Sequence, residues 1–105
     1  MALAEPDNPL AVELKQETAQ AYFAACKRMV ESIEALEAFD RALGSSPRDH
    51  AQTKRRAQLI EEAAERVFYV VIQREAMKLS AYEEFFRNYG IPAEVRARLG
   101  PKRLK

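Results

Sequence analysis

The residues able to carry chemistry in this sequence are few. His50 is the only histidine and Cys26 the only cysteine. A histidine titrates near neutral pH and can act as a base or metal ligand, but His50 is expected in the first turn of a helix, where a solvated side chain is the more common outcome. Cys26 falls between Tyr22 and Met29 on an apolar stripe, which favours a packed core cysteine over a reactive thiol. A single cysteine excludes an internal disulfide and most structural zinc sites.

Carboxylates recur at helical spacing in two places, a pattern compatible with a di-iron carboxylate bundle. The first set is Glu31, Glu34, Glu37 and Asp40, and the second is Glu61, Glu62 and Glu65. That chemistry also needs inward Glu-x-x-His pairs, and the sequence contains none. It also lacks a Gly-rich phosphate loop, a nucleophilic Ser elbow and a Cys-x-x-Cys motif. We therefore expect no enzymatic activity, no catalytic residues, no cofactor and no bound metal.

The composition of the chain is typical of a small helical protein. The 105 residues weigh 12.0 kDa and carry a net charge of +1, with 48% hydrophobic residues and only three glycines. Such a chain forms one domain and favours helix over strand. No apolar run reaches the roughly 18 residues of a membrane span. We expect an all-α, cytoplasmic protein with no membrane association.

The first expected element is a helix over 10–43. Asn8-Pro9 is a typical helix start, Gly44 suits a left-handed C-cap, and no Gly or Pro lies between. Residues 1–8 before it are expected to be a disordered arm. One face of the helix carries the apolar residues Val12, Ala19, Tyr22, Cys26, Met29, Ile33, Leu36 and Leu43.

A second helix is expected from Pro47 to about Lys78, antiparallel to the first because the connection is short. Ser46 as N-cap and Asp49 three residues later resemble an acidic capping box. The run Val67–Ile72 contains six β-prone residues, but its flanks carry no turn residue, which favours helix. A helix that is apolar on all sides must be covered on all sides, by the C-terminal segment, by a second subunit, or by both.

Two short helices are expected to complete the domain, which spans 9–100. Ser80 and Glu83 form a capping box for a helix over 81–89, which Gly90 ends with Ile91 in the position of a Schellman contact. A last helix over 92–98 is expected to stop at Gly100-Pro101, leaving 101–105 as a basic tail. Arg74 or Glu75 is expected to turn inward, with Glu83 and Glu84 as candidate ion-pair partners of Arg74.

The length of the expected hairpin predicts the assembly. Two helices of more than 30 residues reach about 45–50 Å, and the short C-terminal helices shield only one end. A homodimeric four-helix bundle would cover the apolar surface that remains exposed. The residues expected at its interface are Val67, Phe68, Val70, Val71, Ile72, Phe85 and Phe86.

Charge is distributed unevenly along the chain. Residues 1–46 carry a net charge of −4 and residues 47–105 carry +5. This difference fits complementarity between two antiparallel helices, or alternatively a phosphate-binding surface. The candidate nucleic-acid contacts are Lys54, Arg55, Arg56, Arg96, Arg98, Lys102, Arg103 and Lys105.

Two segments of the C-terminal third carry a family resemblance. The stretch Val70–Glu75 ends in Gln-Arg-Glu, and the stretch Tyr89–Gly100 opens with Tyr-Gly-Ile-Pro. Together they resemble a small bacterial helical family known only as a domain of unknown function, with a weaker extension to Leu36–Asp40. The resemblance implies a small helical bacterial protein and no particular chemistry.

These observations predict a non-enzymatic structural or interaction module that acts through protein–protein contact. The alternative is a nucleic-acid-associated helical protein that uses its basic C-terminal segment.

Overall fold

The computed structural model describes residues 9–79 and 81–103, with side chains through Leu99. Four helices in chain order make up the fold: α1 (Pro9–Leu43), α2 (His50–Ala76), α3 (Tyr82–Asn88) and α4 (Ala93–Arg103). The described residues contain no strand, so the all-α prediction is confirmed. The expected arm 1–8 lies outside the described residues.

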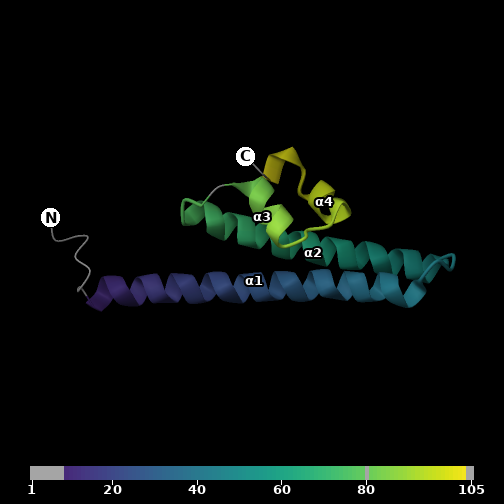
Figure 1. Ribbon diagram of the computed structural model, residues 1–105, viewed down its shortest axis with the longest axis horizontal. Helices are drawn as coiled ribbons and strands as arrows, with labels where there is room; N and C mark the ends of the chain where they lie inside the picture. Colours follow the sequence, from purple (N-terminus) through teal and green to yellow (C-terminus); the bar gives the residue numbers. More distant parts are fainter. Residues whose placement is uncertain (1–8, 80, 104–105) are drawn as a thin grey trace.

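Helix α1 runs for 35 residues without interruption, as the absence of Gly and Pro between Pro9 and Gly44 predicts. Its end is set by Gly44, which has a φ of +58° and donates its N–H to the Asp40 carbonyl. At about 1.5 Å per residue α1 is about 52 Å long, whereas the 27 residues of α2 span about 40 Å. Figure 1 shows α2 lying antiparallel beside α1, which continues past the C-terminal end of α2.

Helix α2 begins three residues later than Ser46-Pro47 predicted. Asp49 is the N-cap: its carboxylate accepts the Gln52 N–H at 2.7 Å, and the Gln52 Oε1 accepts the Asp49 N–H at 2.9 Å. Both donors of a capping box are thereby satisfied. Pro47 consequently lies in the loop rather than in the helix.

The apolar run Val67–Ile72 is helical, as predicted. Val67, Val70 and Val71 have no exposed surface, because α1 and the C-terminal segment cover the inner sides of α2. Tyr69 and Ile72 remain 49% and 44% exposed on the outer side. The run is therefore covered on two sides of the helix and open on the third.

The two short helices depart in part from expectation. Helix α3 has Ala81 as N-cap in a left-handed conformation with no side-chain cap, and the expected cap Ser80 lies outside the described residues. The predicted Schellman ending is confirmed: Gly90 donates to the Arg87 carbonyl and Ile91 to the Phe86 carbonyl. Helix α4 does not stop at Gly100-Pro101 but continues to Arg103. The fixed φ of proline lies in the helical range, so the backbone can stay helical through Pro101 although this residue cannot donate a helical hydrogen bond.

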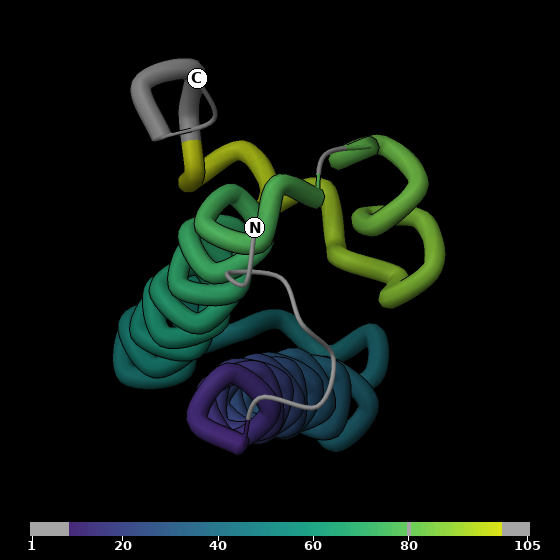
Figure 2. Tube along the Cα trace, turned by 90° about the vertical axis from the view of Figure 1, so that its left-hand side faces the viewer, coloured from purple at the N-terminus to yellow at the C-terminus, as the bar shows by residue number. Residues whose placement is uncertain are grey.

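The C-terminal segment packs against one side of the hairpin, as the end-on view in Figure 2 shows. Val95 and Leu99 of α4 are buried against α2, and Phe85 and Phe86 of α3 are also buried. The core that results joins all four helices in one cluster. It consists of Ala25, Cys26, Met29, Ile33, Leu36, Leu59, Ile60, Ala63, Ala64, Val67, Val70, Val71, Phe85, Phe86, Ile91, Val95 and Leu99.

Candidate functional site

The residues predicted to form a dimer interface lie mostly inside this single chain. Val67, Val70, Val71, Phe85 and Phe86 are buried in the core. Phe68 is partly buried against it, and only Ile72 is exposed. The C-terminal segment, together with α1, thus covers most of the apolar run. A second chain can reach these buried side chains only if the fold opens.

Exposed apolar side chains occur instead on the surfaces that the hairpin leaves free. Those on α1 are Leu10, Val12, Leu14 and Phe23, and those elsewhere are Tyr69, Ile72, Leu79 and Tyr89. Val12 was expected on the inward stripe, but α2 ends at Ala76 before it can cover this part of α1. Phe23 is the most exposed of them, at 68%.

Phe23 was not singled out by the sequence pattern. It is one position out of phase with Tyr22, which faces the core cluster, so a 100° step along the helix turns Phe23 away from α2. Its ring contacts only the edge of that cluster through Tyr22, with the two ring centroids 6.1 Å apart. The sequence signal that could have identified Phe23 is its position as an aromatic residue outside the apolar stripe.

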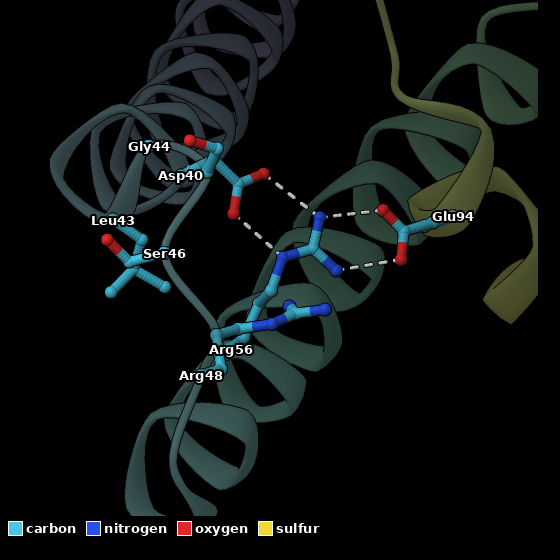
Figure 3. Close-up of a pocket in the computed structure, with 8 residues that line it drawn as sticks. Asp40, Leu43, Gly44, Ser46, Arg48, Arg56 and Glu94 are labelled. Carbon is cyan, nitrogen blue, oxygen red and sulfur yellow. Dashed lines mark hydrogen bonds and ion pairs between the residues drawn. The ribbon is translucent and has the colours of Figure 1, made fainter.

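Three helices meet at a charged cluster near the α1–α2 turn (Figure 3). Arg56 of α2 donates from Nε and Nη2 to both oxygens of Asp40 on α1, at 2.7 and 2.9 Å. Its Nη1 and Nη2 donate to both oxygens of Glu94 on α4, each at 2.7 Å. The Arg56 side chain is only 15% exposed, and its guanidinium joins two carboxylates in the paired geometry that favours arginine over lysine.

The electrostatics of this cluster follow from the shared guanidinium. Hydrogen bonds from Arg56 lower the pKa of Asp40 and of Glu94, and the two carboxylates raise the pKa of Arg56 further above its ordinary value. An open hollow beside the cluster is also lined by Leu43, Gly44, Ser45, Ser46 and Arg48. Because the carboxylates already bind Arg56, the arrangement acts as a structural clamp that holds α4 to the hairpin.

A second polar group lies between α1, α2 and α3. Arg74 Nη1 donates to the Tyr22 hydroxyl at 3.0 Å, and the guanidinium carbon lies 4.7 Å from the centre of the Phe85 ring. A hydrogen bond to Cys26 and burial raise the pKa of Tyr89 to about 12. Burial likewise raises the pKa of Tyr22. This group joins the C-terminal segment to both long helices.

Glu83 and Glu84 were predicted as ion-pair partners of Arg74. Arg74 contacts Tyr22 and Phe85, whereas Glu83 pairs with Arg96 and Glu75 accepts a hydrogen bond from the Tyr82 hydroxyl at 2.9 Å. The left-handed turn at Lys78 and Ala81 sets where the α3 carboxylates lie, and local sequence patterns do not reveal such a turn.

Five of the predicted nucleic-acid contacts have side chains that the structure describes, and four of these five are paired with carboxylates. Besides the Arg56 clamp, the pairs are Arg55–Glu62 at 3.9 Å, Arg98–Glu61 at 3.2 Å and Arg96–Glu83. Lys54 is exposed on α2. The side chains of Lys102, Arg103 and Lys105 lie outside the described part. The nucleic-acid alternative, which also depends on Lys102, Arg103 and Lys105, stays a prediction.

The structure places the two residues considered for reactivity in different surroundings. His50 is exposed at the start of α2, and Cys26 is buried in the core, as the packed-cysteine interpretation predicts. Within the described residues, no three His, Cys, Asp or Glu side chains gather in a way that would hold a metal ion. None of the described helices is long and apolar enough to cross a membrane.

Comparison with protein-family models, curated proteins and solved structures finds no match for this chain. The resemblance of 67–100 to a small bacterial family therefore stays a prediction.

Proposed function

We propose that this protein is a non-enzymatic helical interaction module that acts through protein–protein contact, beginning with self-association into a homodimer. The observation that carries the proposal is Phe23, an aromatic residue that is 68% exposed in the N-terminal half of α1. An aromatic ring of this size loses a favourable burial of about 1.5–3 kcal/mol when left in water. Phe23 does not stand alone, because Leu10, Val12 and Leu14 are also exposed in the same half of α1. Exposed apolar side chains that gather on one region of a surface mark interaction sites.

The elongated shape of the chain supports association. Its radius of gyration is 17.6 Å, against about 13 Å for a compact domain of this length. Its accessible surface is 7643 Å², against about 6,000 Å² for a compact 12 kDa monomer.

Light scattering after size exclusion, over a wide concentration range, tests the proposal. We expect the wild-type mass to rise from 12.0 kDa toward twice that value as the concentration increases. Phe23→Ser should keep the mass at that of the monomer. Tyr69→Ser is the matched control, because Tyr69 is an exposed aromatic residue on α2; this variant should associate as the wild type does. A wild type that stays monomeric at every concentration would refute self-association.

A further inference from the structure

The outer side of α1 has no described element packed on it. In both views the other helices lie on the side of α1 that faces α2 and α3 (Figure 1, Figure 2). On the outer side Glu13, Gln16, Gln20, Phe23 and Lys27 are all exposed. They follow one another at steps of three and four residues, so they lie in one line along the helix. We call this set the α1 outer stripe.

The α1 outer stripe has its charges at symmetric positions. Glu13 lies seven residues before Gln20, and Lys27 lies seven residues after it. Seven residues are almost two full helical turns, so the three side chains lie on one face, about 10 Å apart along the axis. Within the described part of the chain, neither Glu13 nor Lys27 has an ion-pair partner. The stripe is thus acidic at one end, basic at the other and uncharged between them.

This pattern is complementary to itself in one orientation only. If two copies of α1 pack in parallel, Glu13 lies opposite Glu13 and Lys27 opposite Lys27, which is repulsive. If they pack antiparallel around a two-fold axis at Gln20, Glu13 of each copy lies opposite Lys27 of the other. A two-fold interface brings the same patch of both copies together and so forms both pairs at once.

The uncharged centre of the stripe fits the same arrangement. A glutamine amide both donates and accepts hydrogen bonds, so the two Gln20 side chains that meet at the axis can bond to each other. Phe23 lies one turn from Gln20, and the two-fold axis places its ring beside the methylene groups of Gln16 on the other copy. This packing removes Phe23 from water, which is favourable because Phe23 has the highest exposed fraction of the large apolar side chains in the described chain.

We propose that a second copy of this chain docks on the α1 outer stripe, antiparallel, with the two-fold axis at Gln20 and two Glu13–Lys27 pairs between the copies. The inference rests on the proposed self-association and specifies its surface and orientation. The interface is one helix wide and so belongs to the small, reversible class.

Charge reversal tests the orientation by sedimentation or light scattering. Glu13→Lys and Lys27→Glu alone should each weaken the dimer about tenfold, because each creates two like-charge contacts in the complex. The double variant Glu13→Lys/Lys27→Glu restores both pairs with their signs exchanged, and it should associate as the wild type does. Melting curves followed by circular dichroism confirm that each exposed substitution leaves the fold intact.

Mixing the two single variants separates the antiparallel from the parallel arrangement. In the antiparallel dimer an equimolar mixture of Glu13→Lys and Lys27→Glu forms opposite-charge pairs at both ends, so it should recover the wild-type affinity. A parallel dimer has like charges opposed in the wild type and in each single variant. It would therefore leave the single variants about as weak as the wild type and make the mixture tighter than the wild type.

Cysteine crosslinking tests the position of the axis. Gln20→Cys should form a disulfide-linked dimer rapidly under a mild oxidant. Ala38→Cys is the matched control: Ala38 is also exposed on α1, and 18 residues, or five turns, place it on the same face. Two such residues lie far apart in the proposed dimer, so this variant should crosslink slowly. The wild type, with its buried Cys26, serves as the blank.

The outcomes separate the two proposals. A wild type that never dimerises overturns both. A wild-type dimer that no charge variant weakens, or in which Ala38→Cys crosslinks as fast as Gln20→Cys, overturns the antiparallel arrangement and leaves self-association standing.

Discussion

The two ends of the hairpin are stabilised differently. At the turn end, Arg56 forms four hydrogen bonds with Asp40 and Glu94, so that α1, α2 and α4 are joined at a single point. At the open end α1 continues beyond α2, and Leu10 and Leu14 are more than half exposed. Near that end, α1 and α2 are joined by the hydrogen bond from Arg74 to the Tyr22 hydroxyl, at 3.0 Å.

The two ends of the hairpin therefore have different roles. The clamp fixes the positions of three helices relative to one another but offers few free groups to a partner, because its charges are already paired. The opposite half of α1 contributes little to the core and keeps its apolar and charged side chains available. Each of the following predictions tests one part of this contrast.

The largest effect is expected in the core that both ends share. Val71 has no exposed surface, so Val71→Asp places a carboxylate in the core without a partner and should abolish folding, a cost above about 4 kcal/mol. Ile72→Asp, one residue away and 44% exposed, should cost about 1 kcal/mol or less. Thermal melts of both variants make the comparison, and equal midpoints would contradict the division between core and outer side.

The next effect is expected at the clamp. Arg56→Ala leaves Asp40 and Glu94 facing each other without their shared cation, and should lower the free energy of unfolding by about 1–2 kcal/mol, since both carboxylates remain partly exposed. Arg55→Ala, whose ion pair is exposed and 3.9 Å long, should change it by less than about 0.5 kcal/mol. Urea denaturation measures both, and a result in which the two variants match would show that the clamp is not special.

Acid should weaken the same end. Arg56 lowers the pKa of Asp40 and of Glu94 in the folded state. The stabilisation is therefore complete above the ordinary carboxyl pKa values and is lost as the pH falls through the lowered ones. The urea midpoint of the wild type should fall on acidification below about pH 4, and that of Arg56→Ala should fall less. If the urea midpoints of the wild type and of Arg56→Ala fall equally with pH, the clamp has no role in acid sensitivity.

The smallest effect is expected at the connection between α2 and α3, near the open end. Ala81 has a φ of +63°, a conformation that costs an L-residue with a Cβ about 1 kcal/mol or more. Ala81→Gly should relieve part of this strain and raise the stability by up to about 1 kcal/mol. Ala57→Gly, in the exposed interior of α2, should lower it by about as much. Urea denaturation of the two variants should show changes of opposite sign in the free energy of unfolding. If both Ala→Gly substitutions lower it, the strain at Ala81 is not relieved by glycine.

Local patterns in the sequence were sufficient to determine the helices and several of their ends. The uninterrupted span before Gly44, the helical Val67–Ile72 run and the Schellman turn at Gly90 and Ile91 each depend on contacts within a few residues. The α2 start was misplaced because Ser46 and Asp49 both suit an N-cap, and only the reciprocal bonds with Gln52 distinguish them.

The tertiary structure decided what covers the apolar run and which charges remain free. Arg56 lies 16 residues from Asp40 and 38 from Glu94, and no local pattern selects these partners for a basic residue that also fits a phosphate-binding surface. Likewise, the burial of Phe85 and Phe86 and the exposure of Phe23 depend on which side of the hairpin the C-terminal segment occupies. Helix formation is short-range in sequence, whereas burial and charge pairing depend on residues that only the folded chain brings together.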